Sequence, residues 1–224
     1  MRRHPTEELL DHDAGTSEEI ADSLVDLRHI NQWFGGVGTT RRMIEHVAAR
    51  AGSRQLSLLE VASGSGDLPD LARKQLARKG ITISTTLLDR SAAHLPPTGS
   101  GPCSVAADVF ALPFAEASFD IVSSCLFAHH LASDKMGLFF REALRVSRCA
   151  VITNDLIRHP VHLALVYAGL PLFRSPITWH DAPASVRQAY TVGEMSECLK
   201  AAPGAGFEIH RYFLFRMGAI IWKS

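Results

Sequence analysis

Residues 56–67, LSLLEVASGSGD in one-letter code, join an apolar run to a turn of small residues. Such a short apolar run is typical of a buried β-strand, and apolar residues from Leu68 to Leu76 then recur at helical spacing. Small residues let the backbone approach a ligand closely, and glycine also permits a positive φ. The first N–H groups of the following helix have no partner within that helix. The segment therefore predicts a ligand-binding turn at the end of a strand.

Two carboxylates occupy equivalent places after later strands. Asp89 ends the apolar run at 81–88, and Asp108 follows the run at 103–107. In open α/β sheets, ligands bind just outside the carboxyl ends of the strands, where a carboxylate can accept hydrogen bonds from both hydroxyls of a ribose. We therefore expect the small-residue turn and both carboxylates to converge on one nucleoside.

The spacing of the glycines distinguishes between nucleotide cofactors. A dinucleotide fingerprint is G-x-G-x-x-G, and counted from Gly64 its third glycine falls on Pro69. The pattern E-x-A-x-G-x-G, from Glu60 to Gly66, instead resembles motif I of the class I S-adenosylmethionine (SAM) dependent methyltransferases. That motif is usually E/D-x-G-x-G-x-G, and Ala62 takes the place of its first glycine.

Two further runs carry the same resemblance, which covers about residues 56–156. They are DVFALPF at 108–114 and SFDIV at 118–122, and both are typical of small-molecule methyltransferases of this class. The resemblance implies SAM as the cofactor and a binding set drawn from three strand ends. That set is Glu60, Ala62, Ser63, Gly64, Gly66, Asp89, Arg90, Asp108 and Val109.

The resemblance also implies what the members of this set do. The glycines would hold the methionine part of SAM, with Glu60 reaching its amino group. Asp89 would bind the ribose, and Asp108 and Val109 would hold the adenine. Asp120, by contrast, is expected to be structural, because it stands at the start of a strand.

His129 and His130 follow the fourth predicted strand, at a position that lies beside the methyl group of SAM in this fold. Methyl transfer needs little covalent chemistry from the protein, because the sulfonium is already activated. A phenol or other hydroxyl acceptor must nevertheless lose a proton. An imidazole with an ordinary pKa of about 6.5 suits that task, so we expect the catalytic base here, the alternative being a purely structural histidine.

The acceptor site is expected between two segments that mix aromatic with hydrogen-bonding side chains. One lies in the helices before the first strand, and the other is a lid insertion at 157–190. The run NDLIRH at 154–159 resembles the corresponding segment of quinone- and polyketide-modifying methyltransferases. This favours a small apolar or aromatic acceptor, methylated at a phenol-like hydroxyl, and a role in secondary metabolism. The expected substrate-binding residues are Trp33, Arg41, Arg158, His159 and Trp179.

Three alternatives stay open. Within the same class, the reaction can be C-methylation of an activated aromatic or quinone ring. In other classes, the chain can be a non-catalytic SAM-binding regulatory protein, or an NAD(P)-dependent oxidoreductase on a similar fold. Pro69 and the absence of a Tyr-x-x-x-Lys pair count against the oxidoreductase.

The periodicity along the chain predicts the elements that position these residues. Near-continuous apolar runs at 56–61, 81–88, 103–107, 119–125 and 149–153 alternate with helical patterns. This alternation is typical of a buried parallel sheet. We therefore expect an α/β fold. The resemblance implies its form: Rossmann-like and doubly wound, with a mostly parallel seven-stranded sheet, an antiparallel C-terminal strand and a helical cover.

The 224 residues suit one compact domain. Within it, 1–55 is expected to be an N-terminal helical cover and 56–224 the SAM-binding core, with residues 1–15 flexible. T-x-x-E capping boxes at 16–19 and 191–194 predict two helix starts.

The composition limits the kinds of binding partner and metal site to be expected. Lysine plus arginine equals aspartate plus glutamate, 23 each, so no electrostatic argument favours a nucleic-acid partner. The four cysteines form no CxxC pair, so we expect no metal site and a reducing, cytoplasmic compartment. No apolar stretch has the roughly 20 residues that a membrane span needs. A monomer or homodimer acting on a small molecule is expected.

Overall fold

The computed structural model describes residues 1–97, 99, 101–201, 204 and 206–224. Its centre is a seven-stranded sheet in the order β3-β2-β1-β4-β5-β7-β6. The strands are β1 (Gln55–Val61), β2 (Thr82–Asp89), β3 (Cys103–Ala106), β4 (Phe119–Cys125), β5 (Ser147–Leu156), β6 (Gly206–Tyr212) and β7 (Arg216–Trp222).

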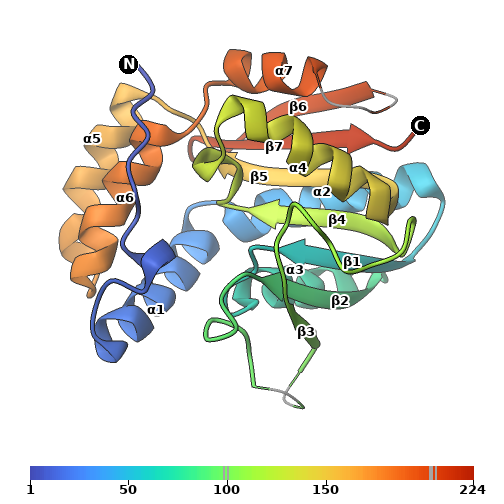
Figure 1. The fold of residues 1–224 in the computed structure, drawn as a ribbon, viewed down its shortest axis with the longest axis horizontal. Coiled ribbons are helices and arrows are strands. Elements are labelled where there is room, and N and C mark those ends of the chain that lie inside the picture. The colour runs from blue at the N-terminus through green and yellow to red at the C-terminus, as the bar shows by residue number, and fades with distance from the viewer. Residues whose placement is uncertain (98, 100, 202–203, 205) are drawn as a thin grey trace.

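Helices and short 3₁₀ turns surround the sheet (Figure 1). Both predicted capping boxes are present, with Thr16 and Thr191 as the N-caps of α1 and α7. The helices are α1 (Ser17–Trp33), α2 (Gly36–Ala51), α3 (Asp67–Ala77), α4 (Ser133–Val146), α5 (Pro160–Gly169), α6 (Pro176–Gln188) and α7 (Val192–Lys200). The 3₁₀ turns are η1 (Leu10–His12), η2 (Ala128–His130) and η3 (Leu170–Leu172).

The predicted fold class is confirmed. Strands β1 to β5 run parallel to one another, whereas β7 is antiparallel to both β5 and β6. The order reverses between β1 and β4, because the chain first builds outward to β3 and then returns to the middle. Ligands of open α/β sheets bind at such a reversal.

Two apolar cores fix the helices on opposite faces of the sheet. Helices α2 and α3 pack on one face, and α4 and α7 on the other. The amphipathic spacing of Phe139, Phe140 and Leu144 turns one side of α4 onto the second face, where all three are buried. The carboxyl ends of the central strands are thereby held rigidly.

A third group of helices lies beyond one end of the sheet. Figure 1 shows α1, α5 and α6 gathered there, and α6 contacts both α1 and α5. In the described part of the chain, none of the helices combines the length and the apolar character that crossing a bilayer requires.

The N-terminal residues 1–13, called the strap below, lie across α6 (Figure 1). Residues 1–15 were expected to be flexible, but the structure shows side chains elsewhere that bind the backbone of the strap. The carboxylate of Asp181 accepts hydrogen bonds from the N–H groups of Leu9 and Leu10, at 2.8 and 3.0 Å. The guanidinium of Arg3 in turn donates to the carbonyls of His129, Leu131 and Gln188.

Candidate active site

The small-residue turn after β1 requires left-handed backbone at three positions. Ala62, Gly64 and Gly66 have φ of 50°, 51° and 73°. At Gly66 a Cβ atom would lie 2.4 Å from Cδ1 of Leu87, so a larger residue fits only if the Leu87 side chain shifts. Ala62 thus adopts a left-handed conformation for which glycine is the usual residue.

Asp89 ties the end of β2 to this turn. One carboxylate oxygen accepts the N–H of Gly64 at 2.8 Å, and the other accepts the N–H of Ser91 at 3.0 Å. Asp108 similarly accepts the N–H of Phe110 at 2.9 Å. Each carboxylate oxygen has two lone pairs, so both groups keep acceptor capacity for a ligand.

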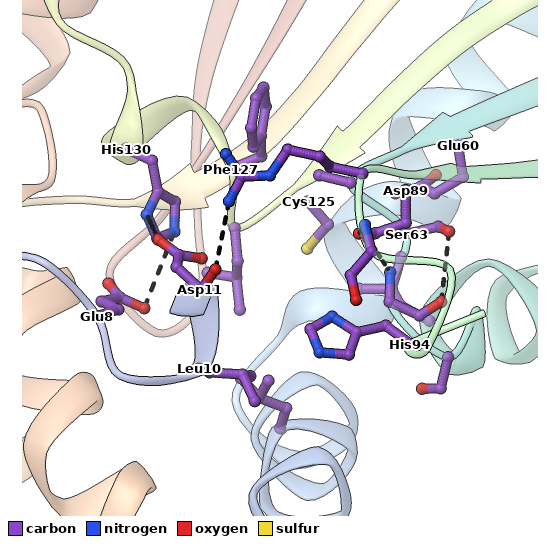
Figure 2. Close-up of a pocket in the computed structure, with 18 of the residues that line it drawn as sticks. Glu8, Leu10, Asp11, Glu60, Ser63, Asp89, His94, Cys125, Phe127 and His130 are labelled. Carbon is purple, nitrogen blue, oxygen red and sulfur yellow. Dashed lines mark hydrogen bonds and ion pairs between the residues drawn. The ribbon is translucent and has the colours of Figure 1, made fainter. Parts of the chain in front are cut away.

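A cavity of about 510 Å³ opens where these elements meet. Figure 2 shows Ser63, Asp89 and Glu60 on one side of it, with Glu8, Asp11 and His130 on the other. Gly66 does not line the cavity; it is the N-cap residue of α3. The other eight residues of the predicted cofactor set all line the cavity: Glu60, Ala62, Ser63, Gly64, Asp89, Arg90, Asp108 and Val109.

Glu60 is buried at the floor of this cavity, only 1% exposed. Its Oε2 atom has no hydrogen-bond partner among the described residues. Burial raises the pKa of this carboxyl to about 7, although the nearby hydroxyl of Ser123 opposes the shift. An unpaired buried carboxyl group is suited to receive a cationic group of a ligand.

His129 and His130 lie on η2, at the edge of the same cavity. Nδ1 of His129 is 2.6 Å from Asp155, and its Nε2 is 3.4 Å from Glu8. His130 pairs through Nδ1 with Asp11, at 2.9 Å. Sequence analysis placed both histidines here but gave no sign of their three carboxylate partners.

Burial would lower the pKa of His129, but the nearby carboxylates outweigh it. The charge of Asp155 and its hydrogen bond to Nδ1, together with the charge of Glu8, raise that pKa to about 10. His129 therefore carries a proton at neutral pH, which makes it unsuited to act as a base. His130 is more exposed, with 20% of its side chain accessible.

A second, apolar cavity of about 130 Å³, called the chamber below, adjoins the first. Glu8, Leu10, Leu27, Leu126 and Ser185 line both. The remaining chamber wall comes mainly from α1, α5 and α6, and its apolar members include Ile30, Phe34, Leu156, Leu165, Val166, Phe173, Val186 and Leu214.

The five residues expected to bind the acceptor line neither cavity. Trp33 stacks on His29 at the end of α1, with ring centroids 4.8 Å apart. Arg41 pairs with Glu45 along α2. The indole N–H of Trp179 donates to a backbone carbonyl of the same segment.

The other two expected acceptor residues are held within the lid. Arg158 is buried, where it pairs with Glu194 and donates to the carbonyls of Met1 and Ala189. It thus fastens the strap to α7. His159 is the N-cap of α5.

Arg216 was missed entirely. It is 1% exposed and lines the chamber, where its Nη2 donates to the side chain of Asn31 at 3.0 Å. Its Nε has no hydrogen-bond partner in the described part of the chain. In sequence it stood within an apolar strand, and no local pattern distinguished it.

Comparison with known proteins identifies the domain. Residues 59–149 match the family model of a methyltransferase domain. The chain contains a methyltransferase domain. The sequence-based identification as a methyltransferase is thereby confirmed. No curated protein matches the sequence.

Solved structures share the fold of this protein over nearly the whole chain. The plantazolicin methyltransferase BpumL, in complex with SAH, has a TM-score of 0.71 at 13% identity, covering 97% of this chain and 95% of its own. The plantazolicin methyltransferase BamL, with a triazolic desmethylPZN analog and SAH, has a TM-score of 0.68 at 13% identity, covering 90% and 91%. Magnesium protoporphyrin IX methyltransferase from Synechocystis, with bound SAM, has a TM-score of 0.52 at 11% identity, covering 94% and 86%.

Proposed function

We propose that the protein transfers a methyl group from SAM to a small apolar or aromatic acceptor, at a hydroxyl oxygen. One observation carries this proposal: turn residues 62–65, Asp89 and Asp108 line a single cavity, and an apolar chamber adjoins it. The first site suits a charged nucleoside and the second an apolar molecule. The two are in contact at Leu126 and Glu8.

The residues around the larger cavity fit the parts of SAM. Asp89 has free lone pairs for ribose hydroxyls, and its bond to Gly64 keeps the turn in place. The carboxyl group of Glu60, buried without a partner for Oε2, suits the ammonium of the methionine part. Asp108 can accept a hydrogen bond from the adenine, and Val109 offers an apolar side chain next to the ring.

Bound SAM would supply an activated methyl group, so the chain must align the acceptor and exclude water. The strap and α1 close the side of the cavity opposite the turn, which serves both needs. The cluster of Glu8, His129 and His130 lies at the edge of the cavity next to the chamber, and we assign to it the activation of the acceptor's hydroxyl. In the metal-free cluster we assign the role of proton acceptor to His130, because it is the more exposed of the two imidazoles.

The chamber limits the acceptor. A cavity of about 150 Å³ holds one benzene ring, so about 130 Å³ suits a single ring or a short chain. Solved structures of this fold include enzymes named for plantazolicin and magnesium protoporphyrin IX, which supports a small-molecule acceptor. Buried Arg216 adds a positive charge to the chamber wall, which favours an acceptor oxygen carrying negative charge.

The test has two steps. Calorimetry with SAM, SAH and NADH should show binding of the first two and none of the third. A panel of monocyclic phenols, the matching anilines and their O-methyl ethers is then offered with SAM labelled on its methyl group. Transfer to phenols alone supports the proposal, whereas ring-methylated products identify C-methylation. SAM binding without transfer to any acceptor favours a regulatory protein, and NADH binding refutes the assignment.

A further inference from the structure

Glu8, His129 and His130 bring three potential metal-ligand atoms within 4.8 Å of one another. Nε2 of His129 lies 3.4 Å from Oε1 of Glu8, and Nε2 of His130 lies 3.8 Å from Oε2. Ligand atoms bonded at about 2.0–2.1 Å to one tetrahedral ion lie about 3.4 Å apart. The cluster therefore needs only small side-chain adjustments to hold an ion.

Each imidazole is oriented by a carboxylate that binds its Nδ1 atom. Nδ1 of His129 is bonded to Asp155 at 2.6 Å, and Nδ1 of His130 to Asp11 at 2.9 Å. In metal sites, the ring nitrogen that does not bind the ion usually donates to a carboxylate or carbonyl. The two carboxylates thus leave both Nε2 atoms turned toward Glu8.

The carboxylate of Glu8 is also held in place. Its Oε1 accepts hydrogen bonds from Ser185 at 2.5 Å and Gln188 at 2.7 Å, which leaves Oε2 as the freer oxygen. Nε2 of His129 is buried, and within the described residues it has no hydrogen-bond partner. An unpaired buried polar atom is costly, and coordination to a cation would remove that cost.

The local charge favours a cation. The carboxylates of Glu8, Asp11 and Asp155 surround the two imidazoles. The nearby guanidinium groups of Arg3 and Arg90 donate there to backbone carbonyls. A metal ion would displace the proton of His129, because a ligating imidazole is neutral. The three carboxylates would then carry an excess of negative charge that a divalent ion offsets.

We propose that Glu8, His129 and His130 bind one divalent transition-metal ion, with an open position toward the cofactor cavity. Two imidazoles and one carboxylate suit Zn²⁺, Co²⁺ and Fe²⁺. The inference rests on the proposed function and gives the ion, instead of a free imidazole, the task of activating the acceptor. The acceptor's hydroxyl binds at the open position and releases its proton to solvent. A lone pair of that oxygen then attacks the methyl carbon while the carbon–sulfur bond breaks and its electron pair returns to sulfur.

Metal binding is tested on the full chain after treatment with EDTA. Equilibrium dialysis against Zn²⁺ should give one ion per chain, and titration with Co²⁺ should give the visible absorption of a four-coordinate site. Glu8→Gln and His130→Ala should each weaken binding at least 100-fold. Asp11→Asn, which removes only an orienting partner, should weaken it about 10-fold.

A matched control is available on the far side of the sheet. His46 and His210 have Nε2 atoms 3.3 and 3.2 Å from Glu208, but their side chains are half exposed. The double variant His46→Asn and His210→Asn should bind metal as the unmodified protein does.

Two results overturn the inference: no stoichiometric binding, which leaves an ion pair only, or binding that survives in Glu8→Gln and disappears in the double variant. Circular dichroism checks the fold of each variant. SAM binding and methyl transfer by the metal-free protein are measured in parallel. If both persist while metal binding fails, only the metal inference falls; if SAM does not bind, the proposed function falls whatever the metal does.

Discussion

The carboxylate of Asp89 has a structural task and a proposed binding task, because it holds the N–H of Gly64 while facing the cavity. In Asp89→Asn one acceptor oxygen becomes a donor. Hydrogen bonds to charged groups contribute about 1.5–3 kcal/mol, so we expect the Kd for SAM to rise about 10- to 100-fold in calorimetry. Asp70→Asn, on the exposed side of α3, should leave it unchanged. An equal Kd in both variants would contradict the assignment.

Glu60 makes a prediction about pH. Its pKa is raised from 4.5 to about 7, so the folded state binds its proton more tightly than the unfolded chain does. Its favourable contribution is complete below pH 4.5 and is lost as the pH rises through about 7. Glu60→Gln stays neutral, so its stability relative to the unmodified protein should grow by about 3 kcal/mol across this window without SAM. Urea unfolding at several pH values measures the difference, and parallel curves would refute it.

Eight of the expected cofactor residues lie around one cavity, because they stand at strand ends or shortly after them and strand ends converge in a parallel sheet. The residues expected to bind the acceptor line neither cavity, because residue type alone does not say which side of a helix faces a cavity. Leu24, Leu27 and Asn31 of α1 line the larger cavity at helical spacing. Trp33, two residues beyond Asn31, points elsewhere because i and i+2 do not share a face.

The turn between β1 and α3 depends on Gly66. Gly66→Ala would combine a positive φ with a Cβ 2.4 Å from Leu87. We expect a loss of at least about 2 kcal/mol in unfolding free energy, together with weaker SAM binding. Gly137→Ala is the matched control, since in the middle of α4 its Cβ would meet no atom within 4 Å. It should be neutral or stabilising by up to about 1 kcal/mol, and similar losses in both would contradict this account.

The strap is attached to α6 through Asp181, which holds the N–H groups of Leu9 and Leu10. Asp181→Asn should therefore speed amide hydrogen exchange at these two residues about 10-fold. Glu7→Gln, on the same segment but with an exposed side chain, should not. Unchanged exchange in Asp181→Asn would mean that other contacts hold the strap.

The parallel strands followed from periodicity, whereas the order of the strap did not. Its residues are polar and lack any repeat, so the sequence suggested no order. Its contacts depend on partners about 120 to 190 residues away, such as His129 and Gln188. The same distance in sequence hid Glu8 from any motif that contains His129 and His130.

For the molecule as a whole, SAM should act as a stabiliser because the cavity exists only in the folded state. Ligand at 100 times its Kd adds about 2.7 kcal/mol to the unfolding free energy. For a chain of this size that corresponds to a rise of about 5–10 °C in Tm. Thermal unfolding with SAM, and with NADH as the control, checks this. A Tm unchanged by SAM would count against the cofactor site.

The strap also has a kinetic consequence. It forms one flank of the cavity with Glu8, Leu10 and Asp11, while the opposite flank is rigid sheet and turn. A molecule that fills the space between these flanks dissociates most readily when the strap detaches from α6. The demethylated cofactor would then dissociate at the rate of this local detachment. An inhibitor that contacts both flanks would have a residence time set by the same event.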